Sequence, residues 1–244
     1  MSVLSVIPAR FASTRFPGKP LADDTGKHLI QHVYERVTAA KRIDECVVAT
    51  DDERIVEAVR SFGGNVEMTR ADHPSGTDRV AEVVERRGGS DDDIIVNVQG
   101  DEPELEPGYL DRLVALLGAS ACPMATLVCP FPAGCDPRDP NCVKVVLNQR
   151  KEALYFSRSL IPYNRDADAG GEPWLLHLGV YAYRRAFLLE YSQWAPTALE
   201  RVEKLEQLRA LEHGCAIGVE VVERASVGID TPKDYEEFVK RRRG

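Results

Sequence analysis

The chain has 244 residues, of which 43% are hydrophobic and 29% are charged, and its formal net charge is −8. This length and composition indicate a globular protein with one large α/β domain, or a core with a smaller lobe. No apolar stretch approaches the ~20 residues of a membrane helix. The acidic charge argues weakly against a nucleic-acid surface, although an acidic protein can still hold a local basic pocket for a nucleotide.

The N-terminus and the cysteines predict a cytoplasmic protein. The first apolar run turns into Pro8-Ala9-Arg10, which is not the pattern of a signal peptide. Six cysteines are present without a C-x-x-C pair. Because we expect no secretory signal, we expect these cysteines to be reduced thiols.

Strand-like and helix-like segments alternate through the first half of the chain. Apolar runs predict strands at Leu4–Ile7, Cys46–Ala49, Val66–Met68, Ile94–Val98 and Ala125–Val128. Amphipathic stretches predict helices at Leu29–Arg42, Asp52–Phe62, Thr77–Arg87 and Gly108–Leu117. This alternation implies right-handed crossovers, so we predict an α/β fold: a mostly parallel, Rossmann-like sheet with helices on both faces.

The pattern changes after about Pro130. Residues 131–142 and 166–173 are predicted loops, and two short strands look like part of a second sheet: Val143–Leu147 and Ala153–Phe156. Further strands are predicted at His177–Tyr183 and Ile217–Val222, and further helices at Arg185–Tyr191, Arg201–Glu212 and Thr231–Arg242. We therefore predict one integrated domain, with a nucleotide-binding core (1–130 plus 215–244) and a smaller β-rich lobe (131–214).

The loop after the first strand carries three cations, Arg10, Arg15 and Lys19, and no acid. In α/β proteins this loop is a common site for anionic ligands, and cations with free backbone N–H groups there would hold a polyphosphate. The loop matches neither the P-loop nor the dinucleotide fingerprint. A solvated basic loop is the alternative, but Gly18 between two prolines favours a fixed path.

Two acidic turns are candidates for a metal site. Asp101 follows an apolar strand, and the carboxyl ends of strands are where open sheets bind ligands. A carboxylate beside a polyphosphate suits Mg²⁺, and Asp230 is a candidate second ligand. The alternatives are a plain turn for Asp101 and helix capping for Asp230 or Thr231, and taken alone capping is the better interpretation.

Polar side chains in two further regions could bind organic groups. The segment 69–79 runs into a helix whose small first residues would let a base or sugar approach, although Ser75 or Thr77 could be a plain N-cap. In the second half, a pocket for a polar acid could be lined by Arg158, His177, Tyr181, Glu206 and Gln207. Each of these alone is more often structural. The chain shows no nucleophile motif and no metal-binding His pair, which favours direct, metal-assisted displacement.

Seven segments, in order, resemble the CMP-KDO synthetases, which are 3-deoxy-manno-octulosonate cytidylyltransferases of GT-A-like α/β fold. The matching segments are 7–20, 68–79, 96–103, 153–158, 177–184, 205–209 and 228–232. The resemblance extends from Ser5 to about Phe238. The sequence departs slightly from the residues usual in this family at Phe11, Phe16, Cys142 and Leu176.

The resemblance implies a role for each matching residue. The CTP phosphates would contact the first loop at Ala9, Arg10, Ser13, Arg15 and Lys19. The cytidine would contact Arg70, Asp72, Ser75 and Gly76. Mg²⁺ would bind to Asp101 and Asp230. The sugar acid would contact Arg79, Gln99, Arg158, His177, Tyr181, Glu206 and Gln207. Family members are usually homodimers built through residues near 130–195.

We therefore predict an enzyme that joins CTP to 3-deoxy-D-manno-octulosonate (KDO) for lipopolysaccharide synthesis, giving CMP-KDO and pyrophosphate. The anomeric hydroxyl would attack the α-phosphorus in line, and Arg15 and Lys19 would offset charge on the leaving pyrophosphate. Asp101 and Asp230 would act through Mg²⁺. We expect small-molecule partners and a homodimer, without nucleic acid or membrane. Two alternatives stay open: another acceptor (sialic acid, amino-KDO or a phosphonate), or a non-catalytic CTP-binding module.

Overall fold

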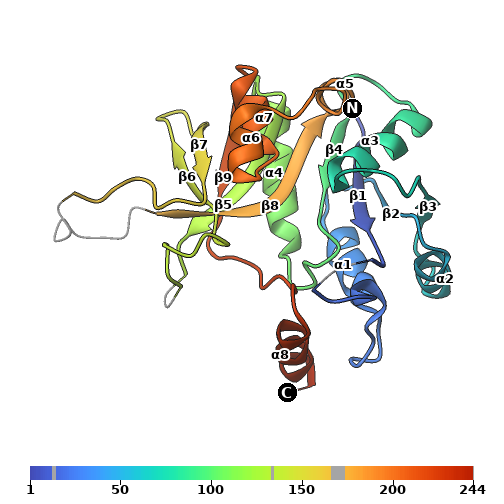
Figure 1. The fold of residues 1–244 in the computed structure, drawn as a ribbon. Coiled ribbons are helices and arrows are strands. Elements are labelled where there is room, and N and C mark those ends of the chain that lie inside the picture. The colour runs from blue at the N-terminus through green and yellow to red at the C-terminus, as the bar shows by residue number, and fades with distance from the viewer. Residues whose placement is uncertain (13–14, 133–134, 166–173, 244) are drawn as a thin grey trace.

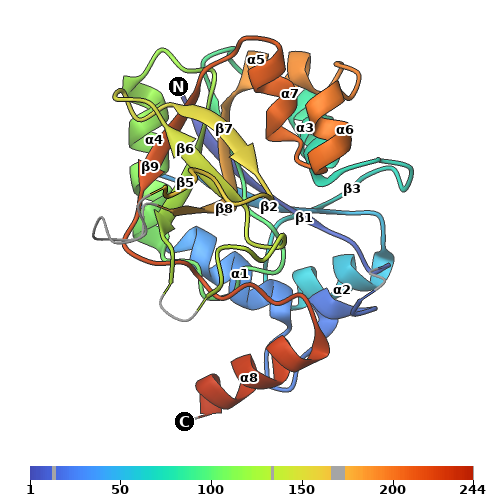
Figure 2. The same cartoon turned by 60° about the vertical axis from the view of Figure 1, so that its left-hand side comes forward.

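One nine-stranded sheet runs through the protein (Figures 1 and 2). The computed structural model describes residues 1–12, 15–132, 135–165 and 174–243. The strands are β1 (Val3–Ala9), β2 (Glu45–Thr50), β3 (Val66–Met68), β4 (Ile94–Asn97), β5 (Met124–Pro130), β6 (Lys144–Leu147), β7 (Ala153–Ser157), β8 (Leu175–Arg184) and β9 (Ile217–Val221). The helices are α1 (Leu29–Thr38), α2 (Glu53–Ser61), α3 (Gly76–Arg87), α4 (Pro107–Ala119), α5 (Arg185–Tyr191), α6 (Ala198–Glu203), α7 (Gln207–Glu212) and α8 (Pro232–Arg243).

The strand order is β3-β2-β1-β4-β8-β5-β9, and the first four strands are parallel. β5 and β9 are parallel to each other, whereas β8 lies between β4 and β5 and is antiparallel to both. The predicted α/β class with a mostly parallel sheet is confirmed. The carboxyl ends of β1 and β4 therefore lie side by side, which brings the loops after residues 9 and 97 to one edge of the sheet.

Helices cover both faces of the sheet because successive strand side chains point to opposite sides. On β1, Ile7 packs into a core with α1, α2 and α4, whereas Val6 packs into a second core with α3, α5 and α7. Figures 1 and 2 show α8 set apart from the sheet, and its Tyr235 and Phe238 pack instead on Leu29 and Ile229. This contact fixes α8 beside the first turn of α1. Among the described residues, no helix has the length and apolar character needed to span a membrane.

Two predictions for the second half are wrong in detail. β6 and β7 do not form a second sheet, because the long strand β8 extends past β4, which pairs only with residues 181–184, and pairs with β6 through Leu176 and Lys144. β8 belongs to the predicted 131–214 lobe, yet it lies between β4 and β5 of the predicted core, and the division into a core and a lobe stays a prediction. The predicted helix 201–212 is broken into α6 and α7 at Lys204, which adopts a left-handed backbone conformation with φ 54°. The predicted loop 166–173 lies outside the described residues.

Candidate active site

Lys19 joins the two acidic turns. Its Nζ donates hydrogen bonds of 2.7 Å to the Asp101 carboxylate and of 2.7 Å to the Ile229 carbonyl. Gly18 makes this placement feasible: its φ of 73° turns the chain into a short 3-10 helix at Lys19–Leu21, and its amide donates to the Phe11 carbonyl at 3.0 Å. A Cβ on Gly18 would lie 3.2 Å from the Phe11 ring, so the left-handed turn favours glycine.

Asp230 lies at the same edge, paired with Arg15 at 2.9 Å. Both side chains are more than half exposed, at 54% and 63%, so this ion pair contributes little stability and can exchange for a ligand. The Asp230 carboxylate does not cap α8. Instead, the Thr231 hydroxyl accepts from the Asp234 amide, and Asp234 in turn accepts from the Thr231 amide and hydroxyl.

Glu102 is a third carboxyl group at this edge, and the sequence reasoning missed it. Its carboxylate accepts a hydrogen bond from Ser226, and a Cβ on Gly228 would lie 3.2 Å from its Oε1. Desolvation raises the pKa of Glu102 to about 7, and the charges of Asp101 and Asp230 add to this effect. Both aspartates therefore lie close enough to act on the same group. The adjacent acids in Gln-Gly-Asp-Glu were the available signal.

We predict that Glu102 makes the ligand-free protein less stable as the pH rises from 5 to 8. Its pKa is about 7 in the folded state against an ordinary 4.5, so folding favours the protonated form. The penalty is absent below pH 4.5, grows through this interval and is complete above 7, where it reaches on the order of 3 kcal/mol. The free energies of unfolding of the wild type and of Glu102→Gln, measured in urea, should therefore diverge over this pH interval. Parallel pH profiles of the two proteins would contradict the prediction.

The predicted phosphate and nucleoside residues surround the end of β1. Ala9 is buried at the end of this strand, and Arg10 donates from Nη2 to the His73 carbonyl at 2.9 Å, which ties the first loop to the segment before α3. Arg70 and Asp72 lie in that segment, form a 3.4 Å ion pair and are both mostly exposed. The predicted contact at Ser13 lies outside the described residues.

The start of α3 approaches β1 closely. Ser75 is the N-cap of α3, because its hydroxyl accepts from the Asp78 amide at 3.2 Å. A Cβ on Gly76 would lie 3.3 Å from Pro8 and 3.8 Å from Gln99 Oε1. Because Gly76 has no side chain, it can pack closely between β1 and the turn that leads to Asp101.

A cavity of about 280 Å³ brings together most of the residues predicted for the acid. Its wall includes six predicted residues from distant parts of the chain: Gly76, Gln99, His177, Tyr181, Glu206 and Gln207. Thr77, Gly179, Tyr183, Tyr191, Lys204 and Leu205 complete the wall. Gln99 precedes Asp101 by two residues, and Gly76 lies close to Gln99. The cavity therefore lies next to the edge of the sheet that carries Asp101 and Asp230, which we call the carboxylate edge.

The polar groups in this cavity are mostly uncharged. Desolvation lowers the pKa of His177 to about 3, so its imidazole is neutral at pH 7, and its Nε2 lies 3.0 Å from the Thr126 hydroxyl. Desolvation also raises the pKa of the Glu206 carboxyl group. The backbone carbonyl of Glu206 accepts a hydrogen bond of 2.6 Å from the Tyr191 hydroxyl. Tyr181 lies between His177 and Tyr183, with ring centroids 5.4 and 5.8 Å away. The wall can therefore hydrogen-bond a polyhydroxylated ligand.

Two predicted arginines do not line this cavity. Arg79 is fully buried, where it donates to the Thr69 hydroxyl at 2.5 Å and lies 3.1 Å from the Asp51 carboxylate, and its contact with the acid stays a prediction. Arg158 donates to three backbone carbonyls, those of Pro140, Glu203 and Lys204. Its predicted contact with the sugar acid through the guanidinium would require these bonds to break.

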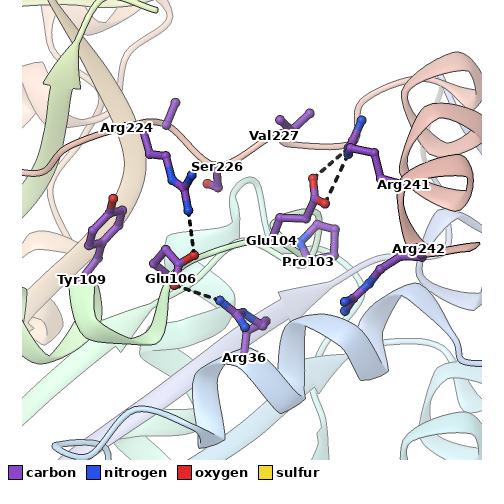
Figure 3. Close-up of a pocket in the computed structure, with 11 residues that line it drawn as sticks. Arg36, Pro103, Glu104, Glu106, Tyr109, Arg224, Ser226, Val227, Arg241 and Arg242 are labelled. Carbon is purple, nitrogen blue, oxygen red and sulfur yellow. Dashed lines mark hydrogen bonds and ion pairs between the residues drawn. The ribbon is translucent and has the colours of Figure 1, made fainter. Parts of the chain in front are cut away.

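A second cavity, of about 430 Å³, lies behind the acidic turns (Figure 3). Its wall contains arginines from α1, α8 and the segment after β9, and three of them pair with a glutamate from the turn before α4. Arg241 pairs with Glu104 at 2.7 Å, and Arg36 and Arg224 pair with Glu106 at 3.2 and 3.3 Å (Figure 3). These bonds connect α1 and α8 to the chain that follows Asp101. They therefore support the turns that carry the candidate carboxylates.

Comparisons with known proteins agree with this geometry. A family model described as Cytidylyltransferase matches residues 4–221. The chain is 52% identical, over 99% of both chains, to 3-deoxy-manno-octulosonate cytidylyltransferase of Geobacter sulfurreducens. It is 50% identical, over 97% of both chains, to the protein of the same name from Aliivibrio fischeri.

Solved structures of cytidylyltransferases also resemble this chain. The chain superposes on CMP:2-keto-3-deoxy-manno-octonic acid synthetase complexed with CTP with a TM-score of 0.91 and 45% identity, covering 99% of this chain and 98% of that one. A cytidylyltransferase from Leptospira borgpetersenii, 20% identical with a TM-score of 0.65, covers 98% of this chain and 85% of its own, and it shares the fold.

Proposed function

The chain belongs to the cytidylyltransferase family, and from that premise we propose that it is a 3-deoxy-manno-octulosonate cytidylyltransferase. It would join CTP to KDO and release pyrophosphate. The observation that carries the proposal is the cavity of about 280 Å³, which holds six predicted acid-binding and nucleoside-binding residues beside the carboxylate edge. The relatives that bear this activity in their names match the chain over nearly its whole length.

The arrangement suits an in-line reaction between two ligands. The CTP phosphates would lie along the loop that carries Arg10, Arg15 and Lys19, with the base near the segment 70–76. The acid would occupy the neighbouring cavity, with Gln99 and Gly76 at the boundary between the two ligands. The anomeric hydroxyl could then face the α-phosphorus near Asp101, so that positioning supplies much of the catalysis.

The residues present fit a magnesium ion. Mg²⁺ in nucleotide sites usually takes one or two protein carboxylates and completes its shell with phosphate oxygens and water. Asp101 and Asp230 supply two carboxylates that act on one shared neighbour, Glu102. When bound, Mg²⁺ would stabilise charge on the α-phosphate and lower the pKa of the attacking hydroxyl.

The cations would act on the leaving group. Lys19 and Arg15 neutralise Asp101 and Asp230 in the protein alone, at 2.7 and 2.9 Å. Both side chains lie at the start of the proposed CTP site, so they would bind phosphate oxygens once CTP is present, with Asp101 and Asp230 left to hold Mg²⁺. They would then offset the charge that develops on pyrophosphate.

The experiment that tests this function is pyrophosphate release with CTP and Mg²⁺. KDO, sialic acid, an amino-KDO, a phosphonate and no acceptor are compared, each with a chelator control. We expect release with KDO that the chelator abolishes. Release with another acid alone would keep the mechanism and overturn the substrate. CTP binding without release for any acceptor would instead indicate a non-catalytic CTP-binding module.

We further propose a cytoplasmic homodimer that acts in lipopolysaccharide synthesis. The dimer would form through residues 130–195, where Leu154 and Tyr163 are 59% and 81% exposed. Large apolar side chains exposed in this way suit an interface between subunits.

A further inference from the structure

The break between α6 and α7 occurs where the sequence favours a helix. Glu203, Lys204, Leu205, Glu206 and Gln207 are all good helix formers, without glycine or proline. Lys204 nevertheless adopts φ 54° and ψ 47°, the left-handed conformation that glycine usually occupies after a helix. For a residue with a side chain this conformation is strained. A backbone conformation that opposes the helix propensity of its own segment often marks a functional position.

The break builds one wall of the acid cavity. Lys204, Leu205, Glu206 and Gln207 all line it, although four consecutive residues of a continuous helix would point in different directions. The surrounding protein holds this conformation. The Lys204 amide donates to the Glu200 carbonyl at 2.8 Å, and Arg158 donates to the carbonyls of Glu203 and Lys204.

Lys204 also supplies the positive charge of the cavity. Among the described residues that line it, Lys204 is the cation and Glu206 the acid, and desolvation keeps His177 neutral at pH 7. Arg79 is buried elsewhere, and the guanidinium of Arg158 is engaged with carbonyl groups. The Lys204 side chain is exposed and makes no ion pair or hydrogen bond to another described residue. A flexible ammonium at the wall of the cavity can therefore reach an anion seated inside it.

We propose that Lys204 binds the carboxylate of the acid substrate and that its left-handed conformation places it on the wall of the cavity where it can do so. The inference rests on the proposed function, because it requires an acidic acceptor. It makes Lys204 a determinant of specificity, since a neutral sugar would gain nothing from the ammonium.

Three substitutions separate the charge of Lys204 from its backbone. We expect Lys204→Met to raise the KM for KDO about 10-fold or more, because a charge-assisted hydrogen bond is lost. Lys204→Arg should stay within about 3-fold of the wild type, since it keeps the charge. Lys204→Gly should raise Tm by relieving the backbone and yet raise the KM for KDO as Lys204→Met does. The KM for CTP should change by less than about 2-fold in all three, because CTP lies outside this wall.

Lys151 is a matched control. It is also a lysine at positive φ, 58°, but it lies between β6 and β7 and does not line the cavity. Lys151→Gly should raise Tm as Lys204→Gly does and leave the KM for KDO unchanged. An unchanged KM for KDO in both Lys204→Met and Lys204→Gly would overturn the proposal.

The outcome is distinguishable from failure of the proposed function. The wild type is first assayed with the full set of acceptors, and the variants are then measured with the acid that it uses. If the wild type uses sialic acid rather than KDO, the proposed function fails, and a raised KM for sialic acid in Lys204→Met would still support the role of Lys204. If the wild type uses no acid, both proposals fail.

Discussion

Replacing Asp101 by Asn is expected to lower kcat by about 10²- to 10³-fold, because a carboxylate that would hold Mg²⁺ beside the reacting phosphate is lost. Asp101 follows β4 at the carboxylate edge, where Lys19 holds it at 2.7 Å. Its side chain is 30% exposed, and Lys19 keeps its bond to the Ile229 carbonyl, so the fold should survive the substitution. Pyrophosphate release under saturating CTP and KDO measures kcat, and Mn²⁺ binding to the CTP-loaded protein should weaken in parallel.

Glu104→Gln is a control for Asp101→Asn. Glu104 is three residues further along and pairs with Arg241 in the second cavity, away from the predicted reacting groups. The same loss of one carboxylate there should leave kcat within about 2-fold of the wild type, because a partly exposed ion pair contributes little. Full activity in Asp101→Asn would show that the metal assignment is wrong.

Replacing Arg79 by Met is expected to destabilise the protein by about 3 kcal/mol, since a fully buried guanidinium is lost and the partly buried Asp51 carboxylate is left without its cation. Arg79 is fully buried between Thr69 and Asp51, at the base of the segment that leads to α3. For a chain of this size the loss corresponds to a fall in Tm of about 6–12 °C. At a temperature where the variant is folded, we expect its KM for KDO to stay within about 3-fold of the wild type.

This experiment decides between two roles for Arg79. The resemblance assigned it to the acid, whereas the structure places it in an internal network. A variant of unchanged Tm with a strongly raised KM for KDO would restore the original assignment. Arg87→Met serves as a control, because Arg87 also pairs with acids, Glu45 and Glu67, but is 27% exposed and should cost about 1 kcal/mol or less.

Local sequence was sufficient for the elements of the nucleotide half. Buried strands such as β4 are continuous apolar runs, and the amphipathic helices between them could pack only on the faces of a sheet, so their pattern predicted the α/β class. The same reasoning placed Asp101 at the end of a central strand. It also treated Gly18 as a sign of an ordered loop, because a glycine between prolines restricts the path of the chain.

Tertiary structure decided the features that depend on distant contacts. β8 joins β6 and β7 to the main sheet because its length allows pairing on both sides, which no local pattern reports. The helix break at Lys204 opposes local propensity and persists because Arg158 holds the adjacent carbonyls.

The sequence by itself determined the fold class, the cationic loop and the two candidate carboxylates, because periodicity and residue chemistry act over short stretches of chain. Only the tertiary structure showed that Glu102 lies beside both aspartates and that Arg79 is internal. It alone placed Lys204 on the wall of the acid cavity. Burial and charge neighbourhoods are set by segments far apart in the sequence, so side chains of one type take different roles according to what packs against them.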